Sequence, residues 1–198
     1  RLYFYLVNQS EVPSITGDII PEYVSSFEEY EKTTIRQYSE DLAKVNAPRC
    51  LLNKEWLNSR GAVIRFDRKA IEIRIMDEQE CVKSDVALSC FIRAVLRGVL
   101  QRKEDAFEYL PHDVLVRNLH AVIRDGLDAT VQHPRGSTAR QVCMSLYRIA
   151  EENASPEEKK YLEIVKRRIE EGSLSDLILK EVTKKALKTD LDETIFAV

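Results

Sequence analysis

The stretch from Arg60 to Asp77, which reads RGAVIRFDRKAIEIRIMD, constrains the fold most strongly. Apolar and charged residues alternate along it in two runs, and side chains along a β-strand point to opposite faces with that period. Among its valine, isoleucine and phenylalanine residues the stretch carries five arginines or lysines and three carboxylates. It is therefore predicted to form two strands with one strongly charged side.

The alternation also limits how the two strands can pair. In a hairpin the apolar faces must coincide, because a slip of one residue would turn the charges toward the core. This requires a connection with an even number of residues. The predicted cross-strand pairs are Ile64 with Ile73, Phe66 with Ile71, Arg65 with Glu72, and Val63 with Arg74. The isoleucine face would then be core, and the other face would gather Arg65, Glu72 and Arg74.

Two interpretations of the charged face stay open. It can be a solvated sheet face, on which each cross-strand ion pair contributes about 0.2–1 kcal/mol. It can also be a binding surface, because the arginine fork matches carboxylates and phosphates in a bidentate manner. In that case the arginines would bind phosphate, and Glu72 would bind Mg²⁺.

Helices are predicted on both sides of this stretch. Ser25 and Ser26 can cap a helix from about Phe27 to Val45, and Ser84 and Asp85 can cap one from Val86 to about Arg102. Four more helices are predicted at about 113–125, from after 138 to 153, from 156 to 172, and from 173 to 187. The chain should therefore divide near residue 105 into a mixed α/β part, residues 1–105, and a helical bundle, residues 106–198.

Composition excludes several classes of protein. The chain has 198 residues, 44% hydrophobic and 32% charged, which is typical of a globular protein. A net charge of −3 argues against a nucleic-acid partner. No apolar run is long enough to span a membrane, and no signal peptide is recognisable.

Because the sequence begins in a strand-like run without methionine, we expect a fragment that lacks an N-terminal part. Four cysteines without metal-site spacing favour free thiols in a reducing cytoplasm: Cys50, Cys81, Cys90 and Cys143.

The segment EWLNSRGAVIRFDRKAIEIRIMDEQECVKSDVALSCFIRAVLRG resembles the C-terminal part of glutamate–cysteine ligase family 2. The block from Arg60 to Cys81 matches the family pattern almost throughout, and VKSD after Cys81 departs from it. NQSEVPSITGDIIPE upstream, with RDGLDATV and GSTARQV downstream, also look like the family. The resemblance implies an α+β fold: part of a glutamine-synthetase-like antiparallel sheet with packed helices, followed by a C-terminal helical bundle.

The resemblance also implies roles for the charged residues. Glu72 would be a metal ligand, and Arg74 would hold a substrate carboxylate or the transferring phosphoryl group. Arg60 and Arg65, five residues apart as in glutamine synthetases, would bind phosphates of ATP or of an acyl phosphate. The spacing to the Glu72 strand is shorter here than in glutamine synthetases, which leaves the individual arginine roles open.

The reaction implied is amide formation that depends on ATP and Mg²⁺. A carboxylate, that of glutamate in the family, is phosphorylated, and an amine such as that of cysteine attacks the acyl phosphate. The alternatives are a ligase for a different amino acid or amine, or a non-catalytic assembly or regulatory domain. No E-x-E strand that would supply the family's further metal ligands is found, so those ligands are expected in a missing N-terminal half. The isolated fragment is expected to be inactive, and a homo-oligomer is compatible with the resemblance.

Overall fold

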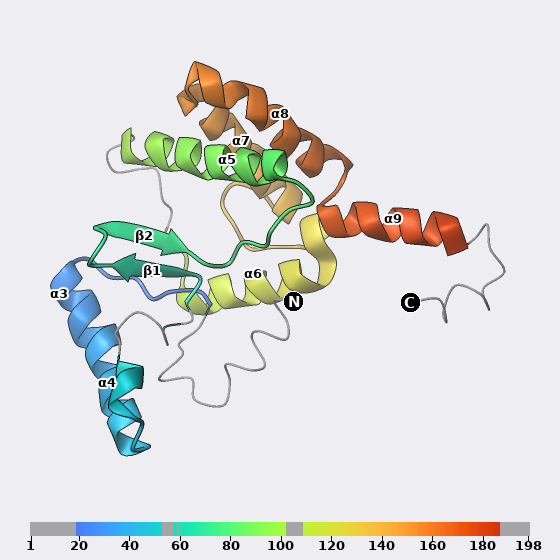
Figure 1. The fold of residues 1–198 in the computed structure, drawn as a ribbon. Coiled ribbons are helices and arrows are strands. Elements are labelled where there is room, and N and C mark those ends of the chain that lie inside the picture. Colours follow the sequence, from blue (N-terminus) through green and yellow to red (C-terminus); the bar gives the residue numbers. More distant parts are fainter. Residues whose placement is uncertain (1–18, 53–57, 59, 102–108, 187–198) are drawn as a thin grey trace. The chain divides into compact units, whose positions relative to one another are not determined.

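The computed structural model describes residues 19–52, 58, 60–101 and 109–186, without the side chains of residues 49, 52 and 186. The fold is α+β, as predicted: helices precede and follow a two-stranded antiparallel sheet (Figure 1). Contacts divide the chain into two compact units, Arg1–Asp77 and Glu78–Val198. We call them the hairpin unit and the helical unit. The predicted boundary near residue 105 would separate a catalytic domain from a helical subdomain, and it stays a prediction.

The first helical segment of the hairpin unit follows the prediction. Helix α3 (Phe27–Tyr30) continues through a π-helical turn, η1 (Glu31–Ile35), into α4 (Arg36–Lys44). Ser26 is the N-cap, and its hydroxyl accepts a hydrogen bond from the backbone N–H of Glu29 at 3.1 Å. A short 3-10 helix, η2 (Arg49–Leu52), lies after α4.

Strands β1 (Ala62–Arg65) and β2 (Ala70–Ile73) form the predicted hairpin in a different register. The observed pairs are Ala62 with Ile73, Val63 with Glu72, Ile64 with Ile71, and Arg65 with Ala70. The predicted pairs, among them Arg65 with Glu72, are wrong by two positions. The reason is that Phe66 belongs to the four-residue connection 66–69, in which Lys69 adopts a positive φ of 49°. A shift of two keeps every side chain on its predicted face.

The isoleucine face is only partly a core. Ile64 packs against a buried cluster on the α3–α4 segment that includes Tyr30 and Tyr38, and the Phe66 ring lies 6.0 Å from that of Tyr30. Ile71, however, is 71% exposed. The prediction that this face is buried is therefore wrong at Ile71.

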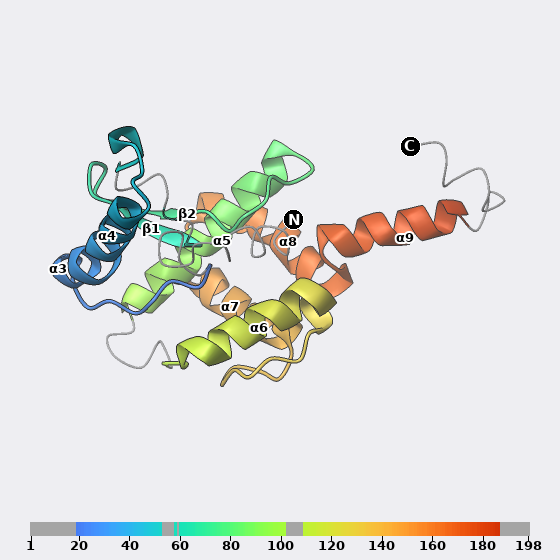
Figure 2. The ribbon, with the colours of Figure 1, turned by 90° about the horizontal axis from the view of Figure 1, so that it is seen from below.

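The helical unit contains the remaining helices (Figures 1 and 2). They are α5 (Val82–Gln101), α6 (His112–Asp125), the 3-10 helix η3 (Gly126–Asp128), α7 (Ala139–Asn153), α8 (Pro156–Glu171) and α9 (Leu174–Ala186). The four helices predicted after residue 110 are thus confirmed within the described residues. Gly126 and Gly172 follow the ends of α6 and α8, both with positive φ.

Helices α5, α7 and α8 pack on one another around small and aliphatic residues. Ala87 and Ala94 of α5, Ala150 of α7, and Leu162 of α8 are fully or almost fully buried in this core. Gly98 brings α5 close to α7, since a Cβ atom there would lie 2.4 Å from Ile149.

The predicted start of α5 is wrong. The helix begins at Val82, and the backbone N–H groups of Ser84 and Asp85 already donate to the carbonyl of Cys81. Ser84 therefore lies inside the first turn, where its hydroxyl donates to Glu80. The carboxylate of Asp85 accepts from the backbone N–H of Gln79.

Candidate active site

Two arginines converge on one glutamate on the charged face of the hairpin. Nη1 of Arg65 donates to one carboxylate oxygen of Glu72 at 2.6 Å, and Nε of Arg74 donates to the other at 3.0 Å. We call these three residues the arginine–glutamate cluster. The side chains of Arg65 and Arg74 are 16% and 22% exposed, whereas that of Glu72 is 39% exposed. The carboxylate is thus held from both sides and open to solvent.

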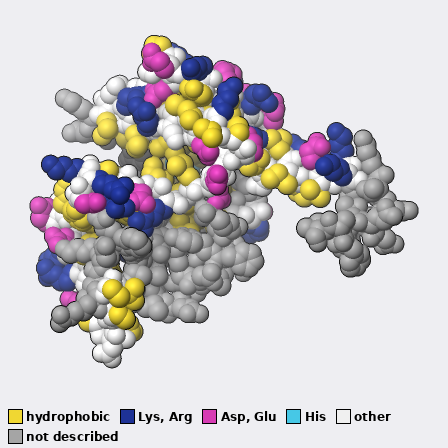
Figure 3. Space-filling model, in the orientation of Figure 1, with side chains coloured by type: hydrophobic (Ala, Val, Ile, Leu, Met, Phe, Trp, Pro, Cys, Tyr) yellow, Lys and Arg dark blue, Asp and Glu magenta, His cyan; other side chains and the backbone are white. Residues whose placement is uncertain are grey.

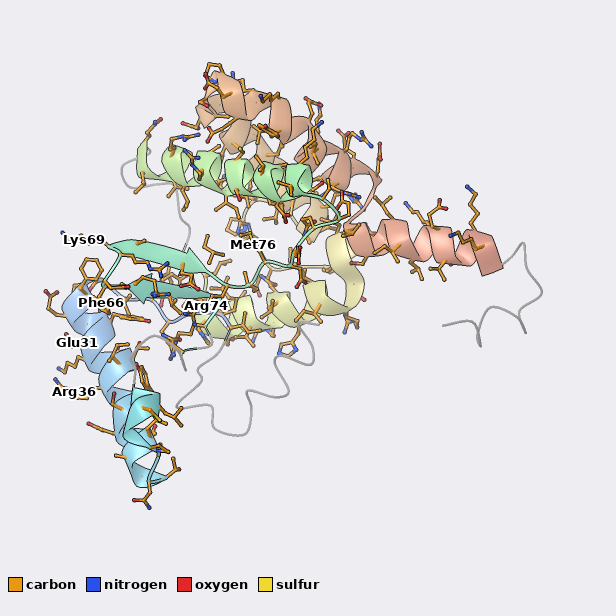
Figure 4. The ribbon with its side chains drawn as sticks, in the orientation of Figure 1. Glu31, Arg36, Phe66, Lys69, Arg74 and Met76 are labelled. Atoms are coloured by element: carbon orange, nitrogen blue, oxygen red, sulfur yellow. The ribbon has the colours of Figure 1, made fainter. Side chains whose placement is uncertain are left out.

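The alternation of the strands produces this cluster despite the shifted register. Glu72 is paired with Val63, so Arg65 reaches it along the diagonal, a distance that long side chains span. Arg74 follows the end of β2, away from the turn that contains Phe66 and Lys69 (Figure 4). In the space-filling view, basic and acidic side chains lie together over the hairpin (Figure 3).

Arg60 does not contact Glu72 and has a different partner. Its side chain is buried and forms a bidentate pair with Glu22, with N–O distances of 2.5 and 2.6 Å. Glu22, which the sequence prediction missed, lies 38 residues earlier in the chain. The predicted phosphate-binding role of Arg60 stays a prediction, and in this structure its fork is occupied by a carboxylate.

Asn58 connects Arg60 to the cluster and was also missed as a site residue. Its side-chain oxygen accepts from the backbone N–H and from Nη1 of Arg60, and its backbone carbonyl accepts from Arg74 at 2.5 Å. Its amide group donates to the hydroxyl of Tyr30 at 2.6 Å. Asn58 is almost fully buried, and it fixes both arginines against the α3 helix. Tyr30 and Arg74 lie 28 and 16 residues from Asn58, so these contacts have no local sequence signal, whereas Arg60 is only two residues away.

Gly61 allows another segment to approach the start of β1. Its N–H donates to the carbonyl of Ile19 at 2.6 Å, and a Cβ atom on Gly61 would lie 2.8 Å from that oxygen. The carbonyl of Gly61 in turn accepts from the N–H of Arg74. This close approach places the segment that carries Glu22 beside Arg60.

The arginines lower the pKa of Glu72. The hydrogen bond from Arg65 is the largest cause and that from Arg74 the second, and both favour the charged carboxylate. Glu72 is therefore ionised at neutral pH. The three residues together carry one positive charge, but Oδ1 of Asp67 lies 3.5 Å from Nε of Arg65 and adds a second carboxylate beside them. An anion such as a phosphate can bind the arginine forks by displacing one of these carboxylates.

A comparison with protein families decides the kind of protein. The family model described as glutamate-cysteine ligase family 2 matches residues 1–192. This chain belongs to glutamate–cysteine ligase family 2. The family resemblance carried by the block from Arg60 to Cys81 is thereby confirmed. The description of this family names a ligase, glutamate–cysteine ligase.

This member of glutamate–cysteine ligase family 2 has a relative in Archaeoglobus fulgidus, described only as an uncharacterized protein. The two are 45% identical over 179 residues, which cover 90% of this chain and 44% of the relative. The chain thus spans less than half the length of the curated relative it matches. No solved structure matches it.

The residues present fit part of the metal site expected for such a ligase. Among the described residues no three histidine, cysteine or acidic side chains are grouped to hold a metal ion. Mg²⁺, however, is often bound by one or two carboxylates together with waters and substrate phosphates. Each oxygen of Glu72 has a second lone pair besides the one facing an arginine. Glu72 fits the role of a single metal ligand, and the two arginines fit phosphate.

Within the described part of the chain, no helix combines the length and apolar character of a membrane span.

Proposed function

We propose that the full-length protein is an ATP-dependent carboxylate–amine ligase that joins the γ-carboxylate of glutamate to the amine of cysteine. The family match over residues 1–192 supports the ligase class. The arginine–glutamate cluster is the observation that supports a site on this chain, because it presents two forks and one carboxylate on an accessible face.

The roles follow from the charges. Arg65 and Arg74 would hold the anionic oxygens of ATP phosphates or of the acyl phosphate, since guanidinium forks stabilise charge that develops in the transition state. Glu72 keeps both forks oriented before substrate binds. Mg²⁺, when bound beside Glu72, would neutralise charge on the transferring phosphoryl group.

This chemistry needs no nucleophilic side chain from the protein. ATP transfers its γ-phosphoryl group to the substrate carboxylate and leaves as ADP. The amine then attacks the acyl carbon and loses a proton to solvent, and phosphate leaves with the electrons of the broken C–O bond. Catalysis of this kind rests on positioning and charge neutralisation. Arg60 supports it indirectly, because Asn58 joins Arg60 to Arg74.

The remaining metal ligands would come from a part of the full-length protein outside this chain. We further propose that the 198-residue chain alone does not turn over ATP, that the protein acts in the cytoplasm, and that it can form a homo-oligomer. ATP turnover by the 198-residue chain, measured as phosphate release, would contradict the first of these proposals.

The full-length protein with ATP, Mg²⁺, glutamate and cysteine should release phosphate and form γ-glutamylcysteine. Glu72→Gln should lower kcat/KM by about 100-fold or more, because it removes the charge that orients both arginines and the metal ligand. The matched control is Arg68→Gln, on the same hairpin but with a 70% exposed side chain at the turn, which should stay within about twofold of wild type.

The amine acceptor is tested by replacing cysteine with other amino acids and amines. Phosphate release that depends on glutamate but prefers another amine would retain the ligase and replace the acceptor. Unchanged activity in both Glu72→Gln and Arg74→Ala would rule out the site. Absence of ATP-Mg²⁺ binding by the full-length protein would favour the assembly or regulatory alternative.

A further inference from the structure

A cavity of about 220 Å³ lies in the helical unit, apart from the residues of the ligase proposal. Its walls are mostly apolar and come mainly from three helices, with Leu88 and Phe91 on α5, Cys143 on α7, and Val165 on α8. Leu127 of η3 and Leu174 of α9 also line it. The polar residues in its lining include Ser84 and Arg168. This is the composition of a small-molecule site: an apolar body with a few polar groups that fix orientation.

The volume sets the size of a ligand. A cavity of about 150 Å³ lined by leucine, isoleucine and phenylalanine accommodates benzene. By proportion, this cavity would accommodate an apolar body of up to about nine non-hydrogen atoms. That is a phenyl ring with a short chain, or a branched aliphatic group.

The polar lining already holds a carboxylate. The hydroxyl of Ser84 donates to Oε1 of Glu80 at 2.7 Å, and Nη2 of Arg168 donates to the same oxygen. The two donors therefore define one carboxylate position next to the apolar space. The side chain of Glu80 is 38% exposed and precedes the first residue of α5. Glu80 can thus move into solvent without leaving a buried charge unpaired.

We propose that this cavity binds a small organic acid with an apolar body, whose carboxylate replaces that of Glu80 between Ser84 and Arg168. The ligand would gain a charge-assisted hydrogen bond from the guanidinium group and one from the hydroxyl. The apolar body would be removed from water among Phe91, Val165 and their neighbours. The site is independent of the ligase chemistry.

The test uses 3-phenylpropanoate as the probe and isothermal titration calorimetry on the full-length protein. The acid should bind at least about tenfold more tightly than 3-phenylpropanamide, which has the same shape without the charge. Glu80→Gln should tighten binding of the acid by about tenfold, because it removes the competing carboxylate. Arg168→Gln should weaken it by a similar factor and abolish the preference for the acid.

Two variants fill the cavity from different helices. Cys143→Leu and Leu88→Phe should each abolish binding, and thermal unfolding identifies a variant that fails to fold. Glu72→Gln, in the hairpin unit, should bind the probe as wild type does. No binding at millimolar probe, equal affinity for acid and amide, binding retained in a folded cavity-filling variant, or binding lost in Glu72→Gln would each overturn the proposal. The calorimetric readout does not require ligase activity, so the two proposals fail separately.

Discussion

Among the described residues, one glutamate lies between two arginines in the hairpin unit and another does so in the helical unit. The two clusters are Arg65, Glu72 and Arg74 in the hairpin unit, and Arg93, Arg97 and Glu158 in the helical unit. Their burial differs greatly: the glutamate side chain is 39% exposed in the first cluster and 8% exposed in the second. Charge and composition alone therefore do not distinguish a candidate site from a structural ion pair.

The two glutamates also differ in the other hydrogen bonds that their carboxylates accept. Glu158 is the N3 residue of a capping box at the start of α8, where it accepts from the backbone N–H of Ser155. Arg97 also donates to the carbonyl of Asn153 at the end of α7. This cluster joins three helices and has its hydrogen bonds committed to the fold. Glu72 accepts side-chain hydrogen bonds from two arginines on an open face, which leaves room for a ligand.

The largest expected effect is on activity, from Arg74→Ala. Removing this fork should lower kcat/KM of the full-length protein by about 100-fold or more, because one preorganised donor is lost. The cost in stability should be about 1–2 kcal/mol, because Arg74 is only 22% exposed and also donates to the carbonyl of the buried Asn58. Steady-state kinetics and urea unfolding of the same preparation measure the two effects. A large loss of stability with normal kcat/KM would make this cluster structural as well.

Glu158→Ala should show the reverse pattern. It removes a carboxylate that is 8% exposed, leaves the 35% exposed Arg97 without this partner, and removes half of the capping box. We expect a loss of about 2 kcal/mol in unfolding free energy, with normal kcat/KM per folded molecule. Urea denaturation followed by circular dichroism provides the first value. If the variant is as stable as wild type but inactive, the roles assigned to the two clusters are wrong.

The sequence predicted the hairpin cluster because strand alternation alone places Arg65, Glu72 and Arg74 on one face. That grouping survives a register error of two residues, since a shift by an even number preserves the face. The register depends on whether Phe66 pairs with Ile71 as part of β1 or belongs to the turn between the strands. In the structure Phe66 lies in the turn, where its ring contacts Phe27 and Tyr30 of α3. Those two residues lie outside the hairpin pattern.

The partners of Arg60 were beyond local reasoning. Glu22 reaches it through the approach of the Ile19 segment to Gly61, a long-range contact with no periodic signal. Asn58 lies only two residues before Arg60, but its burial and its contact with Tyr30 depend on the distant α3 helix. The start of α5 was missed for a different reason. Ser84 resembles an N-cap, but its hydroxyl is used by Glu80, and the helix begins before it. The cap at Ser26 was predicted correctly because its hydroxyl bonds locally, to the backbone N–H of Glu29 three residues later.

A smaller change isolates the cap from the ion pair in the helical unit. Ser155→Ala removes the hydroxyl that accepts from the backbone N–H of Glu158 but leaves the Glu158 carboxylate in place. The expected cost is about 1 kcal/mol, typical of a lost N-cap. Urea unfolding beside Glu158→Ala gives the comparison. An equal loss in both variants would mean that the arginines add nothing to the cap.

The smallest expected difference between the two clusters is in how much unfolding free energy each loses at low pH. Both glutamates have a lowered pKa in the folded protein, Glu72 chiefly through Arg65 and Glu158 chiefly through the backbone hydrogen bond with Ser155. A carboxyl group of this kind stabilises the fold fully above its unfolded pKa, about 4.3. The contribution is lost as the pH falls through the lower folded pKa. Urea unfolding at several pH values between 7 and 3 should therefore show a smaller loss of stability in Glu158→Gln than in wild type. Glu72→Gln should lie closer to wild type, since solvent screens the exposed cluster. If Glu72→Gln instead removed more of the acid sensitivity, the hairpin cluster would be the more important of the two for stability.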